Sequence, residues 1–255
     1  MNNHSSVNNV VSVAPLRNVQ MMLKLADTLI NRNINLPGLG VFSGFSGYGK
    51  TVAANYVRNA KRAHLIEVRS YWTQKAFAEG LLNALHVSSP KGTIAQMISK
   101  ATRILGDEPD RLLLVDEADK LIGKGMIDIV RDIYEDAQIP IIMVGEEVLP
   151  QLLQAHERTH NRVLSWVLAE PCDTTDARSL AKLFCPKIKV EDDLLEEIIA
   201  QTQGVARRVV TTLNQVNEQA RNQGVLEISK ENFEGPYFTG RAPTRHGRQR
   251  AARSK

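Results

Sequence analysis

Apolar residues follow two different spacings along the first two thirds of the chain. Apolar positions three and four residues apart predict helices over residues 15–33, 50–62, 72–86, 93–105, 126–137 and about 148–160. Short, continuous apolar runs lie between these segments and predict strands at 39–44, 64–68, 111–115, 139–144 and 164–170. Strands that alternate with helices predict an α/β fold, in which helices flank a parallel five-stranded sheet.

The pattern changes after Pro171. Three segments with helical spacing follow, and no strand is expected between them: 175–185, 191–202 and 204–222. We therefore expect an α/β domain at 15–171 and a small C-terminal helical lid at 172–235. Beyond these limits we expect a polar, disordered tail at 1–14 and a flexible basic tail at 236–255.

A glycine-rich stretch, "GFSGYGKT", follows the first predicted strand and opens the next predicted helix. It matches G-x-x-x-x-G-K-[ST], the P-loop, in which backbone N–H groups converge on phosphate oxygens. The Lys50 charge then faces the β- and γ-phosphates, and the Thr51 hydroxyl is a ligand for Mg²⁺. ATP and Mg²⁺ are the expected cofactors. The candidate nucleotide-binding residues are Gly44, Phe45, Ser46, Gly47, Tyr48, Gly49, Lys50, Thr51 and Val52.

Two acids end the third predicted strand, in "LLLVDEAD". Asp116 is the candidate for holding Mg²⁺ through water, together with Thr51. It is therefore also a candidate nucleotide-binding residue. Glu117 is then placed to orient and deprotonate a water that attacks the γ-phosphate. The alternative is that Glu117 caps the following helix, a task that Asp119 also fits.

The order of these motifs resembles that of the AAA+ ATPases. The resemblance implies a polar sensor after the fourth strand, where Glu146 stands, and a lid arginine in a G-x-x-R pattern, which selects Arg207 over its neighbour Arg208. It also implies an arginine that reaches the γ-phosphate of a neighbouring subunit. Arg162 is the candidate for that catalytic role, and Arg158 is expected on a solvated helix face. A site completed in this way requires a homo-oligomer.

The stretch "DEADKLIGKGMIDIVRDIYEDAQIPIIMVGEE" resembles the phage Mu B transposition proteins and the TnsC and TniB transposon regulators. This resemblance implies an ATPase that binds duplex DNA without sequence specificity and assembles on it as a helical filament. It implies delivery of that DNA to a DDE transposase in the cytoplasm of a bacterial host. About 35 residues precede the first strand, too few for the helix-turn-helix domain of the phage Mu protein.

Two other functions fit the same motifs. One is a different AAA+ switch, such as a helicase loader or an ExeA-like ATPase. The other is a nucleotide-binding adaptor that does not coat DNA.

Basic residues supply the candidate DNA contacts, since a protein that serves many targets must bind phosphates rather than base edges. After the second strand these candidates are Lys75, Lys91, Lys100 and Arg103. Residues 241–255 add six basic side chains and no acid, an arm for DNA or for the transposase unless it serves only as a solvated tail. Tyr71 and Trp72 are expected in packing rather than in base stacking.

Composition argues against a membrane protein, a secreted protein and a cysteine-based framework. The chain has no apolar run long enough to cross a bilayer and no secretory signal pattern, so we expect no membrane partner. The two cysteines, Cys172 and Cys185, are not in a C-x-x-C pair, and we expect them to pack as small apolar residues.

Overall fold

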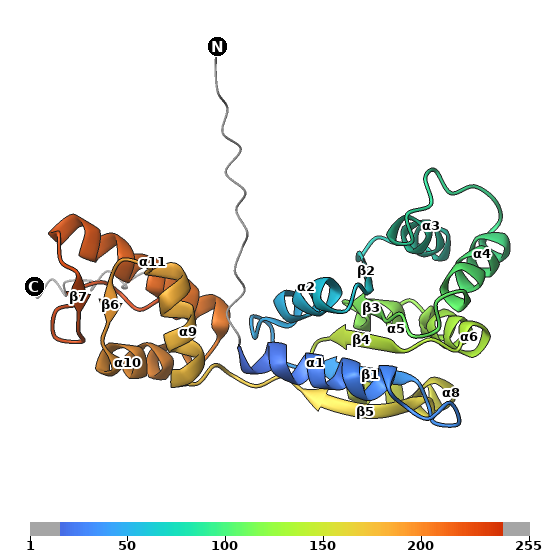
Figure 1. Ribbon diagram of the computed structural model, residues 1–255, viewed down its shortest axis with the longest axis horizontal. Coiled ribbons are helices and arrows are strands. Elements are labelled where there is room, and N and C mark those ends of the chain that lie inside the picture. The colour runs from blue at the N-terminus through green and yellow to red at the C-terminus, as the bar shows by residue number, and fades with distance from the viewer. Residues whose placement is uncertain (1–15, 242–255) are drawn as a thin grey trace, which may run out of the picture.

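The computed structural model describes residues 16–241 of the chain. Five parallel strands form one sheet in the order β2-β3-β4-β1-β5 (Figure 1). The strands are β1 (Leu39–Ser43), β2 (His64–Glu67), β3 (Leu113–Asp116), β4 (Ile141–Gly145) and β5 (Val163–Leu168). Because β1 pairs with β4 on one side and β5 on the other, the loop that follows β1 leaves the sheet from its interior.

Two layers of helices cover the sheet. Side chains alternate along each strand, so Phe42 and Leu114 face a core with α1 (Arg17–Ile30) and α2 (Lys50–Ala60). Their neighbours Val41 and Val115 face the opposite core. The helices of that second core include α3 (Gln74–Ala84), α4 (Ile94–Gly106) and α6 (Ile127–Ala137). This arrangement confirms the predicted α/β sheet with helices on both faces.

The lid lies at one end of the molecule, and α3 and α4 lie at the other (Figure 1). Its helices are α9 (Thr174–Phe184), α10 (Asp192–Thr202) and α11 (Ala206–Gln223). The first core continues into the lid through Ala169 and Cys172, so the lid shares apolar contacts with α1 and α2. A Thr73 cap on α3, a Thr93 capping box on α4 and an Asp173 capping box on α9 fix where these helices begin.

The sequence-based expectations need correction at two places. A strand does lie between the lid helices: β6 (Lys189–Val190) pairs in parallel with β7 (Glu227–Ile228). Two residues are too few to show a period, and the partner strand follows α11, far along the chain. The helix expected at 148–160 is broken into α7 (Leu149–Gln154) and α8 (Glu157–His160). His156, between them, has φ −113° and ψ 67°, which is outside the helical region.

The cysteines are buried and free, as expected of small packing residues. Burial raises the pKa of the Cys172 thiol to about 12 and that of Cys185 to about 11, so both stay protonated and unreactive at neutral pH. Within residues 16–241, no helix is both long and apolar enough to cross a membrane. The N-terminal tail expected at 1–14 and nearly all of the basic arm at 241–255 lie outside the described residues.

Candidate functional site: a cleft between the P-loop and the lid

The glycine loop wraps around the Lys50 ammonium group. Lys50 Nζ donates to the Gly44 carbonyl at 2.6 Å and to the Phe45 carbonyl at 3.0 Å. Lys50 is the first residue of α2 and is 9% exposed, so its charge is held at the start of a helix, where backbone N–H groups are free to bind phosphate. That Lys50 faces the β- and γ-phosphates of a bound nucleotide stays a prediction.

The lid touches the loop at Gly47. The Arg207 N–H donates to the Gly47 carbonyl at 3.2 Å, and a Cβ atom on Gly47 would lie 2.8 Å from Val205 Cγ1. Gly47 also has φ +86°, a left-handed conformation that favours glycine. Any side chain at this position would therefore strain the loop and displace the lid.

Asp116 lies at the end of β3, beside the start of α2. It is 2% exposed and its Oδ1 accepts a hydrogen bond from the Glu117 N–H at 2.9 Å. Burial raises the pKa of Asp116, and the neighbouring Thr51 side chain partly opposes that rise. Asp116 Oδ2 is buried and has no hydrogen-bond partner within the described part of the chain. A carboxylate oxygen left free beside a threonine hydroxyl fits a Mg²⁺ ion held by Thr51 and Asp116, directly or through water.

Glu117 has a left-handed backbone with φ +59° and its side chain lines the cleft. That conformation is uncommon for a residue with a side chain and is often found at functional sites. The Glu117 carboxylate pairs with Lys120 Nζ at 2.9 Å. Lys120 belongs to α5 (Asp119–Ile122), a helix too short to give a periodic signal in the sequence. Lys120 was therefore not predictable as a partner of Glu117 from the sequence.

Glu146 also faces the P-loop. Its Oε1 lies 3.6 Å from Lys50 Nζ, and its backbone N–H donates to Asp119 Oδ1 at 3.2 Å. The residue that follows β4 is therefore placed at the phosphate end of the cleft. Its role as a sensor stays a prediction, because a glutamate there brings a negative charge close to the P-loop lysine.

The cleft has a volume of about 450 Å³ and is bounded by the P-loop, the Asp-Glu strand end and the lid. Arg207 lines it, whereas Arg208 does not and instead contacts Gln203 on the surface. The apolar wall of this cleft was not predicted, because its residues have the spacing of ordinary core positions. That wall consists of Leu16, Leu180, Leu183, Phe184 and Val210.

Arg162 lies at the opposite end of the sheet. Its carbonyl accepts a hydrogen bond from the Leu39 N–H at the start of β1, whereas the P-loop follows the end of β1. The five residues of β1 span roughly 13 Å. The Arg162 guanidinium is 46% exposed and pairs with Glu135 at 2.9 Å, beside Arg131 and Arg158 in a surface hollow. Arg162 therefore belongs to a different face from the nucleotide cleft of its own chain.

The four candidate DNA contacts are exposed on and around α3 and α4. Lys75 lies 3.9 Å from Glu79 in an ion pair, Lys91 lies in the connection between the two helices, and Lys100 and Arg103 lie on α4. Tyr71 is 77% exposed, so its expected role in packing is wrong. Trp72 is partly buried against Gly80, as expected.

Comparison with known proteins agrees with this architecture. Residues 34–153 match the family model described as an AAA domain. The chain has the AAA+ fold. No curated protein sequence matches it.

Three solved structures resemble the AAA+ fold of this chain. The ORC2 protein of Aeropyrum pernix, in ADPNP–ADP complexes, has a TM-score of 0.68 at 15% identity, over 86% of this chain and 67% of that one. The ORC1 protein of Aeropyrum pernix, in complex with DNA, has a TM-score of 0.62 at 16% identity, over 89% of this chain and 66% of that one. The RuvB Holliday junction branch migration motor of Thermotoga maritima has a TM-score of 0.57 at 18% identity, over 86% of this chain and 67% of that one. The chain thus spans about two thirds of the length of each.

Proposed function

We propose that the chain is an ATPase that assembles on duplex DNA and presents that DNA to a DDE transposase. The observation that carries the ATPase part is the meeting of Lys50, Thr51, Glu117 and Arg207 around one cleft, with Asp116 buried behind Thr51. A P-loop lysine, a metal-binding pair and a neighbouring carboxylate are the groups that phosphoryl transfer to water needs.

Each group has a distinct task in hydrolysis. Lys50 and the P-loop N–H groups bind the β- and γ-phosphates, and Arg207 adds positive charge from the lid side. When bound, Mg²⁺ neutralises charge on the phosphate oxygens. Glu117 accepts a proton from the attacking water as the oxygen of that water bonds to the γ-phosphorus and the bond to the β–γ bridging oxygen breaks. ADP and inorganic phosphate leave.

A second copy of the chain completes the site in this proposal. Arg162 lies away from its own cleft and is exposed, so its guanidinium is available to the cleft of a neighbour. The edge strand β5, which follows Arg162 directly, exposes Trp166 at 40% and Leu168 at 60%. Exposed large apolar residues along the edge strand that starts after Arg162 support a protein–protein contact on this edge.

DNA binding is supported by the exposed cations of α3 and α4 and by the basic residues after 240. ORC1, one of the proteins with a similar fold, was solved in complex with DNA. Phosphate-directed contacts of this kind make binding salt-dependent and independent of sequence. Transposition is supported by the resemblance of residues 116–147 to the Mu B and TnsC type of regulator.

Electron microscopy of the protein with plasmid DNA and a slowly hydrolysed ATP analogue tests assembly. We expect a regular helical coat that needs nucleotide, and a strand-transfer assay with the cognate transposase should then show stimulation by the coated DNA. A coat without stimulation would favour a helicase loader or an ExeA-like switch. The absence of any coat would favour a nucleotide-binding adaptor.

A further inference from the structure

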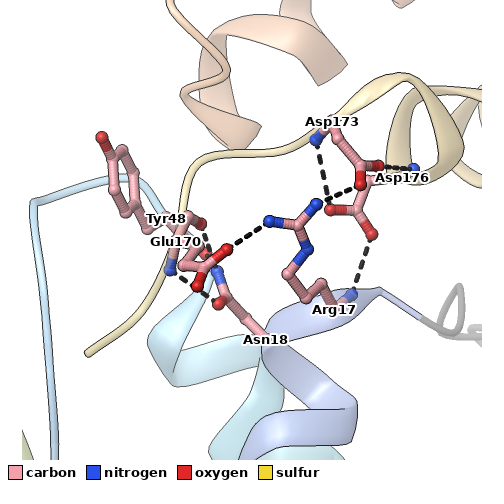
Figure 2. A network of polar contacts seen from close by, with 6 residues as sticks. All are labelled: Arg17, Asn18, Tyr48, Glu170, Asp173 and Asp176. Carbon is pink, nitrogen blue, oxygen red and sulfur yellow. Dashed lines mark hydrogen bonds and ion pairs between the residues drawn. The ribbon is translucent and has the colours of Figure 1, made fainter. Parts of the chain in front are cut away.

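The start of α1 joins the P-loop to residues 169–173, which connect β5 to the first lid helix and are called the hinge below (Figure 2). The Asn18 amide nitrogen donates to the Tyr48 carbonyl in the P-loop at 2.9 Å and to the Glu170 carbonyl at 2.7 Å. In return, Asn18 Oδ1 accepts the Glu170 N–H at 2.9 Å. Asn18 is 6% exposed, so one buried amide binds both the loop that holds phosphate and the segment that leads from β5 to the lid.

The residue before it adds a second set of contacts to the same hinge. The Arg17 side chain pairs with Glu170 and Asp173, and its backbone N–H donates to Asp176 Oδ1 at 2.8 Å (Figure 2). Asp173 and Asp176 form the capping box that opens α9. The first turn of α1 therefore holds the first turn of the lid.

The contacts continue around the lid and return to the P-loop. Beyond Glu170, the Cys172 N–H donates to the Gly204 carbonyl at 2.8 Å, and the Arg207 N–H donates to the Gly47 carbonyl at 3.2 Å. Gly47 and Tyr48 are adjacent, so these hydrogen bonds and the chain between them make a closed ring. The Cys172 and Arg207 links use backbone atoms alone. Asn18 supplies the link that depends on a side chain, which makes it the point at which substitution opens the ring.

We propose that Asn18 is a positioning residue that couples nucleotide binding at the P-loop to the placement of the lid. The coupling rests on the proposed ATPase function. A P-loop ordered around phosphates holds the Tyr48 carbonyl in place, and through Asn18 it holds the hinge. The hinge then sets Arg207 and the apolar wall of α9 against the nucleotide. Without Asn18, the lid binds its share of the nucleotide with an added ordering cost.

Two variants test this role in the full-length protein. Asn18→Asp keeps the acceptor for the Glu170 N–H but turns an oxygen toward two carbonyls, and Asn18→Leu removes all three hydrogen bonds at similar size. We expect each to raise the KM for ATP and the Kd for ADP by about three- to tenfold, the loss expected for one or two hydrogen bonds. The fall in kcat should be smaller, because the lid wall contacts ground state and transition state alike.

Thermal unfolding with and without ADP separates coupling from a merely structural role. A structural role would lower the melting temperature equally in both conditions, whereas coupling predicts that the stabilisation by ADP itself shrinks. Asn31→Asp is the matched control, since Asn31 lies at the other end of α1 and its side-chain amide donates to the local Asp27 carbonyl. We expect this control to keep the nucleotide affinity of the wild type.

Unchanged KM and unchanged ADP stabilisation in both folded Asn18 variants would overturn the inference. If Asn18→Asp changes nucleotide affinity and Asn18→Leu does not, the effect comes from charge repulsion, and the inference is overturned as well. If neither variant folds, hydrogen exchange of the wild type decides: ADP must slow exchange of the Glu170 and Cys172 amides together with the P-loop, and protection that stops at the P-loop contradicts the coupling. A wild type that binds no nucleotide would contradict the proposed function instead.

Discussion

The two ends of the central sheet each carry a positive side chain, and the two side chains differ in burial and in the groups that hold them. At the P-loop end, Lys50 is 9% exposed and is held by two backbone carbonyls. At the other end, Arg162 is 46% exposed and is held by the surface carboxylate of Glu135. The first charge is fixed in the cleft beside the P-loop, whereas the second lies in a surface hollow with Arg131 and Arg158.

This difference indicates how the proposed reaction is divided. In the proposed reaction, the P-loop end supplies the groups for binding nucleotide and activating water. The Arg162 end has a charge that is free to exchange Glu135 for a stronger anion. A ring or filament of identical subunits brings the two ends together, which makes hydrolysis depend on assembly.

Lys50→Ala removes the charge at the P-loop end and is the largest expected effect. We expect loss of ATP binding, because the phosphates lose their buried cation, and with it loss of stable DNA binding. Binding of a fluorescent ATP analogue measures this change. Lys61→Ala, near the other end of α2, is the matched control, since Lys61 pairs with Asp27 on the surface and should leave affinity unchanged. A Lys50→Ala protein that still coats DNA would break the link between nucleotide and assembly.

Glu117→Gln keeps shape and nucleotide binding but removes the base. We expect turnover to fall by roughly 10²–10⁴-fold. The trapped ATP state should bind DNA for longer than the wild type does. Steady-state phosphate release and DNA dissociation rates measure the two effects, with Glu147→Gln as the neighbouring control. Normal turnover in Glu117→Gln would mean that another group activates water.

Arg162→Ala tests the open end of the sheet. We expect hydrolysis to fall by roughly 10³-fold or more, in the range reported for arginines that act on phosphoryl transfer in trans. The Kd for ATP at low protein concentration should stay close to that of the wild type. Arg158→Ala, in the same surface hollow, should have a much smaller effect. Equal losses in the two variants would mean that the hollow, rather than Arg162 in particular, contacts the neighbour.

Asp116→Asn should raise the thermal stability of the protein near neutral pH. Burial raises the pKa of Asp116 above its ordinary value, so the charged carboxylate costs folding free energy at neutral pH. We expect a rise of about 2–4 °C in melting temperature near pH 7, which corresponds to about 1 kcal/mol in a chain of this size. The gain should shrink as the pH falls toward about 4, the ordinary pKa of an aspartate. A gain that does not depend on pH would point to packing instead.

Sequence patterns predicted most helices because each long helix buries one face and shows a period, and they predicted the sheet because its central strands are buried on both faces and read as continuous apolar runs. The same patterns missed α5 and β6, which have four and two residues and are fixed by contacts with distant segments. The P-loop and Asp116–Glu117 were predictable because phosphate chemistry fixes their spacing. The partners Lys120 and Asn18 were not, because their roles depend on which loops meet in three dimensions.

Mixing two inactive variants tests the central claim, that one subunit completes the site of the next. A Glu117→Gln subunit keeps Arg162, and an Arg162→Ala subunit keeps Glu117, so random co-assembly of an equimolar mixture gives complete sites at about one interface in four. The account predicts that ATPase activity in the mixture rises well above the sum of the two separate proteins, at concentrations where the wild type assembles on DNA. A mixture that is no more active than that sum, with both variants shown to co-assemble, would contradict it.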